Sequence, residues 1–218
     1  MARTGVLGDR FLEILAVVLL GVATVGTAWC ALQSALWNGQ QDDLALAASN
    51  QRVEASRLYG LATQTLAYDS NLVGQYAQAV LAEDERSQKF YREVLMRPAL
   101  LPFLDTWQAE IESGGEPPNL VTDEQYLDSL QGDFLAAEEE TERLTTEAAD
   151  AGRTGDSYVL TTVLLAISLF FAGVTSSFRY PAVRTALLVG CSLAIGLAAV
   201  QIIDLPIAEE SGALIPRL

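Results

Sequence analysis

The most informative absence in this chain of 218 residues is histidine, of which there is none. Its absence excludes histidine-ligated metals, Ser–His and Cys–His nucleophiles, and proton relays that run through imidazole. The 16 glycines form neither a phosphate-binding loop nor a dinucleotide-binding fingerprint, because no strand–turn–helix pattern surrounds them. We therefore expect a protein that is not an enzyme, with no catalytic residues, no metal ligands and no cofactor.

Cysteine is also scarce, and both copies lie inside apolar segments. Cys30 lies near the end of the first such segment, whereas Cys191 lies six residues from the start of the third. At about 1.5 Å of rise per helical residue, the two side chains differ in depth by more than a disulfide can span. We expect both to be unpaired residues that pack in an apolar interior.

Charged residues are missing from three long apolar runs, Ile14 to Leu32, Tyr158 to Phe178 and Thr185 to Ile203. Each run contains 19 to 21 residues, and about 20 helical residues cross the hydrocarbon core of a bilayer. A helix satisfies its own peptide groups in lipid, whereas an irregular segment does not. The pattern predicts an all-α protein with three transmembrane helices in contact with a lipid bilayer.

Positive charge is in short supply, since the net charge is −15. Residues 33–157 hold 23 acidic and 8 basic residues, and the rest of the chain holds 5 of each. The whole imbalance therefore lies in one polar segment. A surface of that sign repels nucleic acid and anionic lipid headgroups, so we expect no nucleic-acid partner.

Arginines beside the apolar runs predict the orientation of the chain. Arg3 and Arg10 precede the first run, Arg179 and Arg184 follow the second, and basic residues at such places stay in the cytoplasm. The acidic segment then faces the periplasm or the exterior, and the expected location is a bacterial inner membrane. The predicted organisation is a cytoplasmic tail (1–10), spans at 11–32, 158–178 and 185–204, an extracytoplasmic helical bundle (33–157), a cytoplasmic loop (179–184) and an outer tail (205–218).

Proline is absent before Pro98, so the first span can continue as a helix beyond the membrane. Two sets of apolar and small residues then recur at helical spacing, which is typical of helices packed in a bundle or coiled coil. The first set is Leu44, Ala48, Ala55, Leu58, Ala62, Leu66, Val73, Tyr76 and Val80, and the second is Leu127, Leu130, Phe134, Ala137, Thr141, Leu144 and Ala148.

The number of helical passes between these two sets stays open. We expect four segments, with a reversal near residues 69–71 or a shortened segment at the break made by Pro98 and Pro102. A turn near residues 82–86, which leaves one very long first helix, is the alternative.

Shorter patterns mark helix boundaries farther along the chain. Thr122 and Gln125 have the spacing of a capping box, which predicts a helix start. Gly152 and Gly155 predict a joint just before the second span.

Two groups of residues are candidates for helix association. Gly190, Ala194 and Ala198 recur at every fourth position of the third span and form a ridge that lets helices approach closely in lipid. Gln33 and Asn38 belong to a polar collar just beyond the first span. We expect these residues to mediate association, within one chain or between copies.

A third candidate is the acidic stripe of Asp133, Glu140 and Glu147, which follow one another at sevenfold spacing. Their spacing matches no calcium-binding loop. A solvated helix face is the simpler interpretation, and a lining for a cation path in an oligomer is the alternative.

Several stretches of the sequence look like the landmarks of a known group of proteins and occur in the same order. They are residues 27–41, 52–57, Phe90–Glu93, Arg97–Pro98, 156–160, 169–173 and Phe178–Arg179. In this respect the chain resembles a family of uncharacterised bacterial inner-membrane proteins. The resemblance covers nearly the full chain and implies the same layout of one span, an outer helical region and two further spans. It implies no activity and no functional residues. This chain departs from the pattern in having Cys30 in the first stretch and an acidic, glycine-containing loop at 113–119.

The function expected from the sequence is that of a non-enzymatic structural or assembly subunit. It would display its acidic bundle outside the membrane and form a homo-oligomer or bind another membrane protein. One alternative is a sensor or binding module for a small ligand, which would need a signalling partner. The other alternative is a cation-conducting oligomer.

Overall fold

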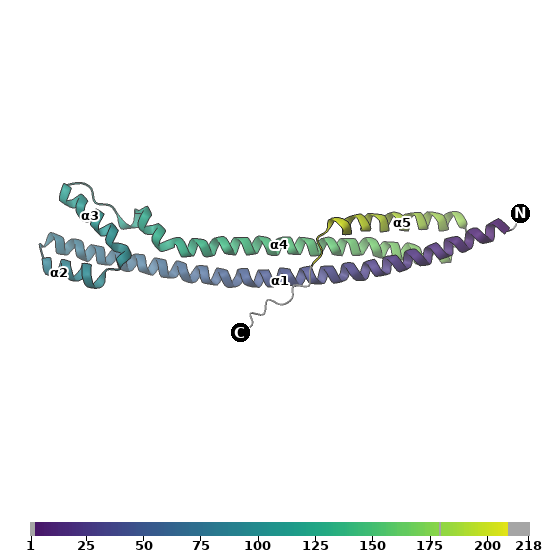
Figure 1. Cartoon of the computed structure of the whole chain (residues 1–218), viewed down its shortest axis with the longest axis horizontal. Helices are drawn as coiled ribbons and strands as arrows, with labels where there is room; N and C mark the ends of the chain where they lie inside the picture. Colours follow the sequence, from purple (N-terminus) through teal and green to yellow (C-terminus); the bar gives the residue numbers. More distant parts are fainter. Residues whose placement is uncertain (1–2, 179, 209–218) are drawn as a thin grey trace. The chain divides into compact units, whose positions relative to one another are not determined.

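The computed structural model describes residues 3–178 and 180–208, and within these ranges the chain is helical and contains no strand. Three helices are long, α1 (Arg3–Leu81), α4 (Glu124–Val174) and α5 (Pro181–Asp204) (Figure 1). The shorter elements are α2 (Glu85–Phe90), the π-helix η1 (Tyr91–Leu95), α3 (Leu101–Ser113), and the 3-10 helices η2 (Pro98–Leu100), η3 (Leu120–Thr122) and η4 (Thr175–Ser177). The predicted all-α fold class is confirmed.

Three helical segments are long and apolar enough to cross a membrane: residues 10–81, 124–177 and 181–204. Within their most apolar windows only 11%, 28% and 17% of the residues, respectively, are buried inside the protein. Most residues of each apolar window are therefore not buried inside the protein, which is compatible with helices that cross a membrane. The predicted tails and loop include residues 1–2, 179 and 209–218, which lie outside the described residues.

The chain divides into two units. The span unit comprises residues 1–45 and 145–218, and the head unit comprises residues 46–144. Helices α1 and α4 each contribute to both units, and α5 belongs to the span unit alone.

The core of the span unit is built from small residues around a few large ones. Ala23, Cys30 and Ala198 are completely buried, together with Tyr158 and, nearly so, Leu165. Small side chains let helix backbones approach closely, which is the main source of packing energy between helices in lipid. Both cysteines of the chain are free and buried.

Two glycines of α4 serve close packing in the span unit. A β-carbon added at Gly155 would lie 2.5 Å from Oδ1 of Asn38, and one added at Gly152 would lie 2.7 Å from the amide of Gln41. α4 runs through both positions without a break. The predicted joint at Gly152 and Gly155 is therefore wrong, because these glycines make room for polar side chains of α1.

The head unit has its own apolar core, contributed by α1, the short helices and the start of α4. Its buried members are Leu72, Tyr76, Met96, Leu100, Phe103, Leu104, Trp107, Leu120 and Tyr126. Every residue of the two predicted apolar sets, on α1 and on α4, is buried or half-buried. The amphipathic pattern of both helices is confirmed.

The reversal of the chain lies at residues 82–84, directly after α1 ends at Leu81. Glu83 adopts a left-handed conformation with φ of 54°, while the Asp84 amide donates to the Ala79 carbonyl at 3.0 Å. This arrangement satisfies carbonyls at a helix end and usually employs glycine. The alternative of one very long first helix is thus the correct one, and a reversal at 69–71 is wrong because α1 continues through those residues.

The predicted break at the prolines is also present. The backbone of Met96 and Arg97 is extended, and Pro98 then opens η2. Pro102 does not break a helix, because it lies in the first turn of α3, where its missing amide hydrogen is not needed. The break therefore separates α2 and η1, which precede it, from η2 and α3, which follow it.

The start of α4 lies one residue later than the predicted capping box requires. Asp123, rather than Thr122, caps the helix, because its carboxylate accepts a hydrogen bond from the Tyr126 amide at 2.7 Å. Thr122 instead donates its hydroxyl to the Asn119 carbonyl at 3.2 Å.

Candidate functional site

A completely buried carboxylate, that of Asp69 on α1, lies in the head unit. Arg97 donates to it from both Nε, at 3.4 Å, and Nη2, and the Tyr126 hydroxyl donates to Oδ2 at 2.5 Å. Burying a charge without partners is very costly, so this carboxylate depends on both donors. The three side chains join α1, the break before η2 and the first turn of α4.

The electrostatics of this cluster follow from burial and pairing. The hydrogen bond to Asp69 raises the pKa of Arg97, which therefore stays charged. Burial, and then the neighbouring Asp69 carboxylate, raise the pKa of Tyr126, which therefore stays protonated and continues to donate. The cluster is a charged pair with one neutral donor, and the buried Asp69 carboxylate accepts hydrogen bonds from both partners.

Asp69 was not among the residues singled out from the sequence. The available signal was its position on the apolar face of α1, between Leu66 and Val73, where a carboxylate is unexpected. Its partners are 28 and 57 residues away along the chain. Helical periodicity alone cannot identify partners at such separations.

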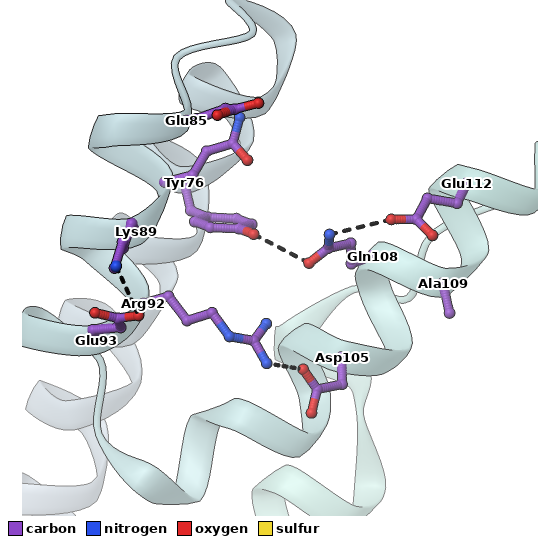
Figure 2. A pocket seen from close by; sticks show the side chains of 10 residues that line it. Tyr76, Glu85, Lys89, Arg92, Glu93, Asp105, Gln108, Ala109 and Glu112 are labelled. Carbon is purple, nitrogen blue, oxygen red and sulfur yellow. Dashed lines mark hydrogen bonds and ion pairs between the residues drawn. The ribbon is translucent and has the colours of Figure 1, made fainter.

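A polar cavity of about 550 Å³ lies beside the apolar core of the head unit (Figure 2). α1 contributes Tyr76, α2 and η1 contribute one wall, and α3 contributes the other. Its lining residues are Tyr76, Glu85, Gln88, Lys89, Arg92, Glu93, Asp105, Gln108, Ala109 and Glu112. Lys89 is the single lysine of the whole chain.

Local structure explains how the first wall of the cavity is set. Asp84 caps α2, since its carboxylate accepts from the Ser87 amide at 3.2 Å and from the Ser87 hydroxyl at 2.6 Å. The helix then widens into η1 over residues 91–95. A π-helical turn of this kind is rare and is frequent at functional sites.

Polar contacts join the α3 wall of the cavity to Tyr76 of α1 and to the wall formed by α2 and η1. The Tyr76 hydroxyl donates to Oε1 of Gln108 at 3.1 Å, and Gln108 donates to Glu112 at 3.2 Å. Arg92 reaches from η1 to form an ion pair with Asp105 on α3 (Figure 2). The hydrogen bond to Asp105 raises the pKa of Arg92, so the guanidinium stays charged.

The charges of the cavity decide which molecules it could hold. Four carboxylates, those of Glu85, Glu93, Asp105 and Glu112, face two cations, so the lining carries a net charge of −2. Such a lining favours small polar molecules that carry a positive charge. Among residues 3–178 and 180–208, no group of three acidic or cysteine side chains is arranged to hold a metal ion.

The predicted polar collar is used within the span unit. Gln33 is buried, and its side-chain oxygen accepts from the Ala208 amide at 2.8 Å. The Pro206 carbonyl accepts from the indole of Trp37 at 3.1 Å and from the hydroxyl of Tyr158 at 3.2 Å. The segment after α5 is therefore tied to both α1 and α4.

The other predicted association residues also lie at contacts inside the span unit. Asn38 faces Gly155, although its side chain stays largely exposed. In α5, Ala198 is completely buried, Ala194 is half-buried, and a β-carbon added at Gly190 would lie 3.6 Å from the Phe171 ring. Whether these residues also join copies of the chain stays a prediction.

The predicted acidic stripe lies along α4. Asp133 belongs to the head unit and is exposed, and Glu140 forms an ion pair with Arg143 at 2.6 Å. Glu147 belongs to the span unit and is also exposed. The hydrogen bond from Arg143 lowers the pKa of Glu140. A cation path along the stripe stays a prediction.

Comparisons of the chain with protein-family models, with curated proteins and with solved structures gave no match. The resemblance to a family of bacterial inner-membrane proteins therefore stays a prediction.

Proposed function

We propose that the protein is a non-enzymatic membrane protein of structural or assembly type, which associates with its own copies or with another membrane protein. Its acidic helical domain, residues 33–157, would lie outside the cytoplasm of a bacterial cell, with the N-terminus inside. The three apolar helical segments support membrane insertion. The arginines at positions 3, 10, 179 and 184 support this orientation.

A single observation carries the assembly function: large apolar side chains are exposed on α1 in the head unit, beyond the predicted first span. Leu46 is 63% exposed, Val53 69%, Leu61 47% and Tyr68 50%. Lipid does not reach these residues in the proposed topology. Apolar surface of this kind, gathered along one helix, marks a binding surface for another protein.

Mass measurement in mild detergent tests the assembly function. The full chain, purified from membranes, should elute as a discrete oligomer or together with a second membrane protein, with its protein mass determined by light scattering. A population that contains only monomers, without any partner, would remove the proposal.

Labelling in intact cells tests the orientation. A cysteine placed at the exposed Glu139 should react with a membrane-impermeant maleimide, whereas wild-type protein should stay unlabelled because Cys30 and Cys191 are buried. Protection of the Glu139→Cys variant in intact cells, with reaction only after lysis, would contradict an outer head unit.

The cavity of Figure 2 favours a second candidate, a binding module for small cationic or zwitterionic molecules. Such a module would need a signalling partner. A screen of amines and amino acids against the full chain should then give a ligand whose thermal stabilisation is lost in the Asp105→Asn variant. A flat screen would count against this candidate and would leave the assembly function untouched.

A further inference from the structure

The part of α1 in the head unit, residues 46–81, has two opposite faces. Every seventh residue from Ala48 to Tyr76, namely Ala48, Ala55, Ala62, Asp69 and Tyr76, is buried. The opposite face is exposed and carries what we call the outer stripe: Leu46, Asn50, Val53, Leu61, Gln64 and Tyr68.

The spacing of the outer stripe is that of a second helix-packing face. Leu46 and Val53 are seven residues apart, Leu61 follows after eight, and Tyr68 after seven more. The amides of Asn50 and Gln64 lie between these apolar residues, and the exposed Arg57, which is paired with Glu54, lies between Val53 and Leu61. A helix face with this period packs against another helix in a coiled-coil manner.

The charge of the head unit indicates which surface can meet a second acidic molecule. Residues 82–144 contain 16 acidic and 5 basic residues, a net charge of −11, whereas residues 46–81 contain two of each sign. Of the two carboxylates in residues 46–81, Asp69 is buried against Arg97, and Glu54 is bonded to Arg57 at 2.8 Å. α1 is therefore the one long element of the head unit that two copies can bring together without net repulsion.

We infer that the outer stripe is the contact between two copies of this chain, whose α1 helices pack side by side and in parallel. This inference rests on the proposed assembly function and names its partner. Two copies inserted in one membrane with the same orientation are related by an axis along the membrane normal, so equivalent residues lie at equal depth.

The composition of the stripe fits contact between identical helices. In a parallel pair each apolar residue meets its own equivalent, Val53 against Val53 and Leu61 against Leu61. Asn50 and Gln64 are self-complementary too, because a carboxamide both donates and accepts hydrogen bonds. A row of lysines or glutamates would not have this property.

Disulfide crosslinking in membranes tests the contact. Val53→Cys should form a covalent dimer on mild oxidation, and the matched control Leu135→Cys, on the exposed acidic surface of α4, should not. The native cysteines are buried and can stay in place, so wild-type protein is the blank.

The possible outcomes separate the inference from the proposed function. Two outcomes would overturn the inference and leave the assembly function standing. In the first, light scattering shows an oligomer that crosslinks through Leu135→Cys but not through Val53→Cys. In the second, Val53→Cys crosslinks to a different protein. Monomers alone, with no crosslink at either position, would sink both.

Charge substitution gives an independent measurement in detergent. Val53→Glu places two carboxylates against each other in the dimer, and we expect at least tenfold weaker association, with Leu135→Glu unchanged. Both side chains are exposed, so circular dichroism should show the same helix content in both variants. Equal association of the two variants would refute the contact, and if Val53→Glu loses its helix content, the crosslinking result decides.

Discussion

Removing the Asp69 carboxylate should loosen the head unit more than any exposed substitution. In the Asp69→Ala variant, Arg97 loses the acceptor for its Nε and Nη2 groups, and Tyr126 loses the acceptor for its hydroxyl. Tyr126 is 3% exposed, so water does not easily replace the missing bond. The Arg97 side chain is 39% exposed and can be hydrated again.

These exposures set the magnitude of the effect. A hydrogen bond to a charged group contributes about 1.5–3 kcal/mol, and a buried donor without an acceptor costs about 1–3 kcal/mol. Discounting the solvated Arg97 contribution, we expect Asp69→Ala to lower the free energy of opening of the head unit by about 3 kcal/mol, or more than about a hundredfold in the equilibrium constant. Asp69→Asn should cost only about 1 kcal/mol, because its amide oxygen still accepts from Tyr126.

Hydrogen exchange measured by mass spectrometry on the full chain in detergent provides the assay. Peptides from α3 and the start of α4 should exchange faster in Asp69→Ala, and peptides from α5 should be unaffected. Glu54→Ala, which removes an exposed ion pair on the same helix, is the control and should match wild type. Exchange within about threefold of wild type in Asp69→Ala would refute the reasoning, since it would correspond to less than about 1 kcal/mol.

Three further predictions concern single positions. Gly155→Leu should lower the midpoint of thermal unfolding in detergent, with a cost of about 2 kcal/mol from overpacking, whereas Gly173→Leu, on the same helix with nothing within 4 Å of an added β-carbon, should not. The hydrogen bond from the Ser87 hydroxyl lowers the pKa of Asp84 in the folded protein. The Asp84 cap therefore stabilises α2 at pH values above the pKa of Asp84 in the unfolded chain, and this stabilisation is lost as the pH falls. Exchange of the Ser87 amide should therefore accelerate relative to intrinsic rates from about pH 6 to about pH 3 in wild type and not in Asp84→Asn. Burial raises the pKa of Tyr126. The hydrogen bond that the Tyr126 hydroxyl donates therefore stabilises the head unit below about pH 10, and this stabilisation is lost as the pH rises further. In an ultraviolet titration, the tyrosine that ionises last in wild type should be missing from Tyr126→Phe.

The regular parts of this fold are predictable because helix formation follows local rules. Uncharged runs of 19 to 21 residues are sufficient to identify the three spans, and the period of the apolar residues identifies the inner faces of α1 and α4. A helix face depends only on residues within a few turns. Such information is present in a single sequence.

The candidate sites are less predictable because they depend on contacts between distant segments. The cavity exists only once Tyr76 of α1 and Asp105 of α3 are brought to one place by a turn and by a π-helix that no sequence pattern marks. Gly152 and Gly155 show a different difficulty. A glycine in a helix can loosen the backbone or can admit a neighbour, and only the packing partner, here α1, decides which.

The short segment that follows α5 imposes an order on biogenesis. The Pro206 carbonyl accepts a hydrogen bond from Trp37, and the Ala208 amide donates one to Gln33. Both residues follow α5 in the chain, so the ribosome synthesises them after α1, α4 and α5. A chain that has been synthesised only to the end of α5 therefore holds a glutamine and an indole that lack these bonds.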